Sequence, residues 1–124
     1  MKVVIYILYV VMSKKQDKIK RELVKVYKEI ANERLFMCTG CRRNGHSVAL
    51  SHSHLIPRSR RPDLVLDKKN ITYHCLTFID NNGKSRKGCH DIWESKDRDS
   101  LLDYWVNLDY IKKVDEEYYY LITL

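Results

Sequence analysis

The sequence contains no apolar run long enough to cross a bilayer. Its most hydrophobic stretch, residues 1–12 (MKVVIYILYVVM), is twelve residues long, whereas a membrane-spanning helix needs about 20. No small-residue cleavage site follows it, only the polar residues 13–16, which argues against a signal peptide. We therefore expect no membrane partner and a translation start at Met12. The alternative is that this stretch, rich in Val, Ile and Tyr, forms a strand.

Internal repeats, low-complexity tracts and clear linkers are also missing. The 124 residues are enough for one modest domain but not for two. Hydrophobic residues make up 44% and charged residues 31% of the chain, an ordinary globular composition that excludes disorder. We expect a single domain over residues 13–124, with its core in residues 36–95 and the apolar leader 1–12 before it.

Positive charge exceeds negative charge in this sequence. There are 23 Lys and Arg residues against 16 Asp and Glu residues, which gives a formal net charge of +7. Such a surplus favours a polyanionic partner, and nucleic acid is the commonest one. Basicity alone is weak evidence, because many small soluble proteins are basic, so the partner has to be argued from motifs.

The cysteines number four, with none left over: Cys38, Cys41, Cys75 and Cys89. A Cys-x-x-Cys loop is too short for a typical structural disulfide, but it suits one metal ion, and four thiolates are a standard tetrahedral zinc site. Gly40 would let the first pair curl into a knuckle, and the polar insertion after Cys75 can loop out. We therefore predict structural Zn²⁺ and a reducing, cytoplasmic location. Free buried thiols, or a knuckle completed by His74, are the alternatives.

Hydrophobic periodicity predicts an α+β fold. The expected elements are a helix over 13–35, a histidine-bearing strand entered through 47–50, a strand over 71–75, helices over 89–94 and 101–108, and a strand over 118–124. The central strands and helix would form one small unit stapled by the zinc site, with flanking N- and C-terminal helices. His46, His74, Trp93 and Trp105 are expected to be structural.

One stretch combines residues that are weak signals when taken singly. Residues 53–59 (SHLIPRS) are followed by Asn70, sixteen residues after His54, and then by the pair Cys89-His90. Together with the four cysteines, this pattern resembles the His-Asn-His (HNH) endonucleases of the four-cysteine zinc subtype. Its form is similar to small phage and mobile-element members, which implies a phage-infected bacterial host. The resemblance covers residues 38 to about 94 and implies a ββα-metal fold, the His-Me finger.

The resemblance implies a role for each matching residue. His54 would be the general base that takes a proton from the attacking water, a task that suits imidazole at neutral pH. His90 would bind a catalytic Mg²⁺ or Mn²⁺, which stabilises the leaving 3′ oxygen. Asn70 would hold the loop between the strands and orient His54 by hydrogen bonding. The implied activity is metal-dependent hydrolysis of DNA phosphodiester bonds.

The pattern departs from the family at two positions. The residue before the base is usually an Asp or His metal ligand, but here it is Ser53, a poor ligand. The catalytic cation could rest on His90 with help from Ser53 itself, His52 or Asp91, although strand alternation would place the two strand histidines on one face and Ser53 on the other. A histidine often found a few residues after Cys-His is absent. Glu94, one helical turn after His90, could serve as a ligand or as a partner of the ligating histidine.

A basic loop flanks the proposed base and is expected to contact phosphates. Its residues are Arg58, Arg60, Arg61, Lys68 and Lys69. The expected partner is DNA. RNA stays open, because a basic groove and a bound phosphate do not distinguish the two sugars. Two other functions also stay open: an inactive zinc-stabilised nucleic-acid-binding module, which Ser53 favours, and a phage accessory or assembly protein in which the charge is incidental.

Overall fold

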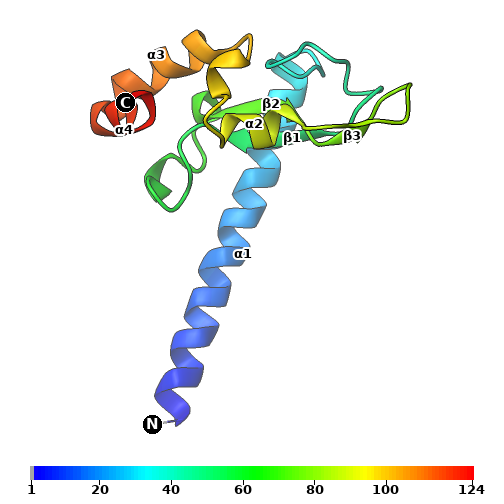
Figure 1. Ribbon diagram of the computed structural model, residues 1–124. Helices are drawn as coiled ribbons and strands as arrows, with labels where there is room; N and C mark the ends of the chain where they lie inside the picture. The colour runs from blue at the N-terminus through cyan, green and yellow to red at the C-terminus, as the bar shows by residue number, and fades with distance from the viewer. Residues whose placement is uncertain (1) are drawn as a thin grey trace. The chain divides into compact units, whose positions relative to one another are not determined.

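The computed structural model describes the backbone of residues 2–124 and the side chains of residues 14–124. Its helices and strands are α1 (Lys2–Glu33), β1 (Leu50–His54), β2 (Ile71–Cys75), β3 (Phe78–Ile79), β4 (Ser85–Arg86), α2 (Cys89–Trp93), α3 (Tyr104–Val114) and α4 (Glu116–Thr123). The expected α+β class is therefore confirmed. Over the described backbone it consists of four α-helices and two small antiparallel sheets (Figure 1). The chain divides into two compact units, Met1–Arg34 and Leu35–Leu124.

The first unit consists of the single helix α1. The helix expected over 13–35 is confirmed, but α1 already begins at Lys2, so the strand considered for the apolar leader is wrong. Once a helix exists, each added residue gains a hydrogen bond, so it extends readily into a run without Pro or Gly. Among the described residues, no helix is both long and apolar enough to span a bilayer.

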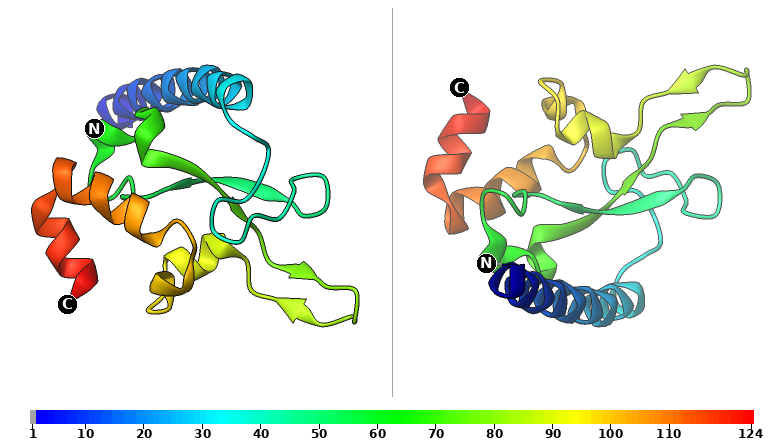
Figure 2. Two further views of the ribbon diagram at one scale, coloured as in Figure 1. Left: turned by 90° about the horizontal axis from the view of Figure 1, so that it is seen from above. Right: turned by 90° about the horizontal axis from the view of Figure 1, so that it is seen from below.

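The second unit is organised around the β1–β2 sheet. The two strands pair antiparallel, with Leu50 opposite Cys75 and His54 opposite Ile71, and both expected strands are confirmed. All five residues of β2 are buried, which fits a strand covered on both faces. The β3–β4 hairpin lies in the insertion between Cys75 and Cys89 and projects away from this sheet (Figure 2).

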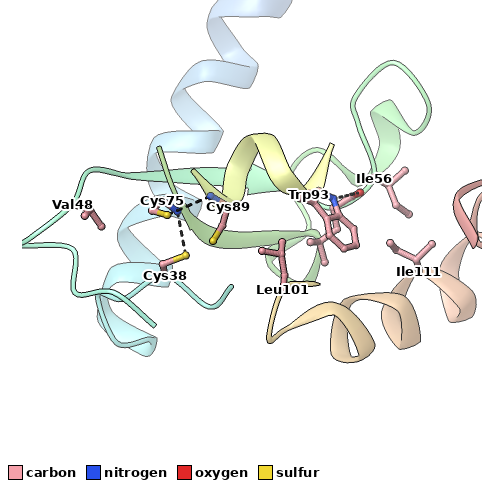
Figure 3. Close-up of a cluster of buried hydrophobic side chains, with 9 residues drawn as sticks. Cys38, Val48, Ile56, Cys75, Cys89, Trp93, Leu101 and Ile111 are labelled. Carbon is pink, nitrogen blue, oxygen red and sulfur yellow. Dashed lines mark hydrogen bonds between the residues drawn. The ribbon is translucent and has the colours of Figure 1, made fainter. Parts of the chain in front are cut away.

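The core of the second unit joins the cysteines to a set of apolar side chains. Its buried members are Cys38, Val48, Leu55, Ile56, Cys75, Cys89, Trp93, Leu101 and Ile111. Figure 3 shows the sulfur atoms at one end of this cluster, with Trp93, Ile56 and Ile111 toward the other. Trp93 is only 3% exposed, and its Nε1 donates to the carbonyl of Leu55 at 3.1 Å. This bond ties α2 to the end of β1.

The helix expected over 101–108 begins later, at Tyr104. The residues before it are held in other contacts: the amide of Leu102 donates to the carbonyl of Gly40 at 2.9 Å, and Asp103 accepts from Thr39 at 2.7 Å. Tertiary bonds therefore take the place of the first helical turn. Trp105 was expected in the core, but it is 75% exposed, so that expectation is wrong.

The tail 118–124 is helical, which corrects the strand expected there. Aromatic residues favour strands mainly when they can pack on a sheet, and this segment pairs with no described strand. Asp115 instead caps α4, because its carboxylate accepts a hydrogen bond from the Tyr118 amide at 3.1 Å. A side-chain cap of this kind satisfies an amide that would otherwise lack a partner at a helix start.

Asp115 also anchors the basic loop to the junction of α3 and α4. Arg60 donates to both of its carboxylate oxygens, each at 3.2 Å, and Arg61 lies 3.4 Å from one of them. Arg61 additionally donates to the Val114 carbonyl at 2.9 Å. The hydrogen bond from Arg60 lowers the pKa of Asp115 below the ordinary carboxyl value. The loop is thus fixed by a buried carboxylate that is only 8% exposed.

Two substitutions of Asp115 should separate its capping role from its ion pairs. Asp115→Ala removes both, and loss of the cap alone costs about 1 kcal/mol; Asp115→Asn keeps an acceptor for the Tyr118 amide and should lose less. Because folding lowers this pKa, the stabilisation is present above about pH 4 and is lost as pH falls. Urea unfolding at pH 7 and pH 3.5 measures both effects.

The matched control is Asp109→Asn, which removes an exposed ion pair with Lys113 at 3.1 Å. Exposed pairs of this kind contribute little, so the unfolding midpoint should barely move. If Asp115→Asn lost as much stability as Asp115→Ala, the cap to the Tyr118 amide would add nothing to the ion pairs with the arginines.

Candidate functional site

Four cysteine sulfurs converge from three segments of the chain. Cys38 and Cys41 lie in the loop before β1, Cys75 ends β2, and Cys89 begins α2. All four sulfurs lie within 4.8 Å of one another, and the Sγ atoms of Cys41 and Cys75 are 3.8 Å apart. Two sulfurs each about 2.3 Å from a tetrahedral zinc ion would be about 3.8 Å apart. The four cysteines can therefore hold a metal such as zinc.

Backbone amides donate hydrogen bonds to two of these sulfurs. The Cys75 amide donates to Cys38 Sγ, and the Cys89 amide donates to Cys75 Sγ, both at 3.3 Å. A hydrogen bond from Cys89 lowers the pKa of Cys38 to about 4, and the same bond raises the pKa of Cys89. Burial raises the pKa of Cys75 to about 11. Clustered thiolates repel one another, so a divalent cation fits this donor set.

Glycine is required at this site for close approach rather than for an unusual backbone angle. A Cβ on Gly40 would lie 2.9 Å from the Cβ of Cys89, and a Cβ on Gly88 would lie 2.3 Å from a backbone carbon of Leu76. The knuckle residue with a positive φ is Arg42, at 65°. The expectation that Gly40 supplies the curl is thus replaced by a packing reason.

His54 ends β1 with one ring nitrogen already engaged. Its Nε2 lies 2.9 Å from the carbonyl oxygen of Val65. A carbonyl can only accept, so Nε2 carries the proton, and in the neutral ring Nδ1 is left with a lone pair. The backbone at Val65 thus selects the tautomer in which Nδ1 can accept a proton.

Asn70 holds the loop that supplies this carbonyl. It is fully buried. Its Oδ1 accepts from the Ile56 amide at 2.8 Å, and its Nδ2 donates to the carbonyls of Ile56 at 3.1 Å and Leu64 at 3.2 Å. Ile56 lies two residues after His54, and Leu64 directly precedes its partner Val65. The bonds of Asn70 go to the backbone, so its influence on His54 is indirect.

His90 and its neighbours on α2 form a second group that could hold a metal. Ligand atoms of His90, Asp91 and Glu94 lie within 4.8 Å of one another. His90 Nε2 is 3.9 Å from a Glu94 carboxylate oxygen, and the other ring nitrogen, Nδ1, lies 2.6 Å from Ser53 Oγ. Ser53 therefore contacts the candidate ligand His90 through its hydroxyl.

A pocket of about 220 Å³ brings β1 and α2 together. Its lining residues are His54, Leu55, Pro57, Trp93, Glu94, Arg98 and Tyr118. The guanidinium of Arg98 lies over the Trp93 ring, 5.4 Å from its centre, and its Nε donates to the Ser95 carbonyl at 3.1 Å. One pocket thus offers an imidazole, a carboxylate and a fixed cation.

Other predicted residues lie apart from this pocket. His52 packs on the Tyr73 ring, with the ring centres 5.3 Å apart, and burial lowers its pKa. Among the described residues it belongs to no group of possible metal ligands. Arg60 and Arg61 are held by Asp115, whereas Arg58 and Lys69 are exposed.

The remaining histidines have neighbours of a structural kind. His74 is buried, and its Nε2 lies 2.8 Å from a carboxylate oxygen of Asp103. His46 stacks edge-on against Phe36, with the ring centres 5.4 Å apart. The four-cysteine cluster therefore forms without His74 as a stand-in.

Sequence reasoning missed Arg98 and Ser51. Nothing in the sequence distinguishes Arg98 from other exposed cations, since its place in the pocket depends on the fold. Ser51 had a usable signal, because residues two apart on a strand share a face. It lies next to Ser53, with the two hydroxyl oxygens 3.1 Å apart.

Comparisons of the chain with protein-family models, curated proteins and solved structures give no significant match.

We expect one Zn²⁺ per chain, bound by the four cysteines. Structural zinc binding is worth about 10 kcal/mol or more, and domains are stable by only about 5–15 kcal/mol. A strong chelator, or Cys89→Ser, should therefore unfold the unit Leu35–Leu124. Elemental analysis measures the zinc, and fluorescence reports exposure of Trp93.

A core substitution at the end of the cluster away from the sulfurs provides the control (Figure 3). Ile111→Val should lower stability by about 1 kcal/mol while one zinc stays bound. Zinc retained at full stoichiometry in Cys89→Ser would contradict the four-cysteine site.

Asn70→Ala should destabilise the protein by about 2–3 kcal/mol, because it leaves the Ile56 amide and two carbonyls without partners. Asn82→Ala, at an exposed position in the β3–β4 turn, is the control and should stay within about 0.5 kcal/mol. Urea denaturation measures both. Equal stability of the two variants would show that the buried bonds of Asn70 add nothing.

Proposed function

We propose that the chain is a divalent-metal-dependent endonuclease of the HNH type, which hydrolyses DNA phosphodiester bonds on a ββα-metal unit stapled by zinc. The observation that carries the proposal is the pocket shared by His54 and Glu94. Glu94 also belongs to the possible ligand group with His90 and Asp91. A general base and a candidate metal site therefore adjoin the same space.

His54 is the proposed general base. Its Nδ1 would accept a proton from water, the hydroxide so formed would attack phosphorus, and the bond from phosphorus to the leaving 3′ oxygen would break. The hydrogen bond from Nε2 to the Val65 carbonyl supports this role, because it orients the ring and leaves Nδ1 with the lone pair. Asn70 would be a positioning residue, since it fixes the backbone on both sides of that bond.

His90 and Glu94 are the proposed protein ligands for Mg²⁺ or Mn²⁺. The carboxylate of Glu94 fits these cations: Mg²⁺ takes one or two carboxylates and completes its shell with water and phosphate, and carboxylate and water ligands also suit Mn²⁺. The bound cation would supply Lewis-acid stabilisation of charge on the phosphate and on the leaving oxygen. Asp91, the residue after His90, lies about 100° round the helix axis from it, and its Oδ2 accepts from Thr77 at 3.2 Å.

Arg98 would bind the phosphate that the pocket receives. Contact with Trp93 and Ser95 fixes its guanidinium in the pocket that His54 also lines, so little side-chain entropy is lost on binding. A neighbouring pocket of about 510 Å³ shares Glu94 and Arg98 and adds Lys96. This second space could take the adjoining nucleotide, with Arg58 and Lys69 as outer phosphate contacts.

A zinc-stabilised nucleic-acid-binding module without catalysis is the second candidate. The contact between Ser53 and His90 favours it, because the position that carries a metal ligand in the family carries a hydroxyl here. In that case the basic residues would bind DNA, and no divalent cation would produce cleavage.

His54→Ala should reduce Mg²⁺- or Mn²⁺-dependent nicking of supercoiled plasmid by about 10²- to 10⁴-fold, the usual contribution of a general base. Gel electrophoresis with Mg²⁺, Mn²⁺ or EDTA in parallel measures it, and a labelled RNA tests the sugar preference. His46→Ala, an exposed histidine outside the pocket, is the control and should cut like the wild type.

Two results would count against the nuclease. If His54→Ala cut as fast as the wild type, the base would be another group. If the wild-type protein shifted DNA on a gel but cut it with no metal, the binding module would be the better description. Neither binding nor cleavage would favour an assembly role.

A further inference from the structure

A chain of hydrogen bonds runs from β2 through β1 to α2. Ser51 Oγ donates to the His74 carbonyl at 3.0 Å. Ser51 Oγ and Ser53 Oγ are 3.1 Å apart, and Ser53 Oγ lies 2.6 Å from Nδ1 of His90. The two serines share one face of β1, since they are two residues apart on the strand, and Ser51 pairs with His74 in the register.

Counting protons gives this chain a single direction. A hydroxyl has one proton to donate. Ser51 gives its proton to the His74 carbonyl, which can only accept, so in the pair of hydroxyls Ser53 must be the donor. Ser53 has then used its own proton, so in the last bond it must accept, and Nδ1 of His90 must donate.

This direction determines which nitrogen of His90 can bind a cation. With the proton on Nδ1, Nε2 of the neutral ring has a free lone pair. Nε2 is also the atom near Glu94, 3.9 Å from its carboxylate oxygen. Two ligands about 2.1 Å from one ion are about 3.0 Å apart when they occupy adjacent positions. The Glu94 side chain, 67% exposed, is free enough to close the difference.

We propose that Ser51 and Ser53 are positioning residues that hold His90 as the Nδ1-protonated tautomer, with Nε2 directed to a divalent cation shared with Glu94. The inference rests on the metal site of the proposed function. It gives Ser53 a task that needs no direct ligation: the hydroxyl is an outer-shell acceptor for the ligating histidine. Such partners fix tautomer and ring orientation at metal sites.

Burial makes the two-serine chain effective. Ser53 is 2% exposed, so water does not compete for its hydroxyl. If Ser51 lost its hydroxyl, Ser53 would be free to reverse and donate to Nδ1, which would favour a proton on Nε2 and block the metal-binding atom. The outer serine thus controls the direction in which the inner serine points.

The direct test is the tautomer of His90 in the full-length protein with no Mg²⁺ or Mn²⁺ added. Long-range ¹H–¹⁵N spectra distinguish a protonated ring nitrogen from one with a lone pair. In the wild type, Nδ1 of neutral His90 should be protonated and Nε2 should not. Ser51→Ala should shift population toward the Nε2-protonated form. Ser85→Ala is the control, because Ser85 is an exposed strand residue that takes no part in this series of hydrogen bonds. It should leave the spectrum unchanged.

Mn²⁺ binding, followed by electron paramagnetic resonance, gives the second readout. Ser51→Ala and Ser53→Ala should each weaken binding by about 10-fold, the lower end of outer-shell effects, and Ser53→Thr should restore it by restoring the hydroxyl. A wild-type His90 protonated on Nε2, no Mn²⁺ binding by the wild type, or unchanged affinity in both alanine variants would overturn the proposal. The expected tautomer and Mn²⁺ affinity without any DNA cleavage would instead refute only the nuclease.

Discussion

The four-sulfur cluster is the constraint on which the second unit depends. It joins the knuckle, the last residue of β2 and the first residue of α2, three segments that the sequence separates widely. Cys89 is followed directly by His90, so anchoring that sulfur also fixes where the first turn of α2 lies. A protein of this size has a small core, and a metal that joins these three segments can supply folding energy that apolar burial does not.

Hydrogen bonds from side chains to the backbone then fix the elements that line the pocket. The indole of Trp93, the last residue of α2, donates a hydrogen bond to the Leu55 carbonyl, and this bond holds the helix against the end of β1. Asn70 bonds the backbone on both sides of the loop that bears the partner of His54. A buried asparagine with every bond satisfied is costly to replace. The loop is therefore rigid where the imidazole needs a fixed partner, although it contains little regular structure.

The elements that sequence reasoning predicted are those fixed by local pattern. Cysteine number and spacing predicted the sulfur cluster, and a short β-prone run predicted β2. The tail and the start of α3 were mispredicted, because Asp115 and Asp103 act through partners distant in sequence. Arg60 and Arg61 were expected to contact phosphates, but their pairing with Asp115 depends on tertiary structure that the sequence does not reveal. Arg98 shows the same limit, since only the fold brings it to the pocket.

Serine at position 53 has a consequence for how the two candidate metal sites are coupled. A ligand at this position would come from β1 and fix the cation to the sheet. With a hydroxyl there, the proposed protein ligands, His90 and Glu94, both belong to one short turn of helix. The position of that turn is set by Cys89 at its start and by Trp93 near its end. Movement at the sulfur cluster would therefore displace both ligands together relative to His54, so the structural metal would govern the geometry of the catalytic one.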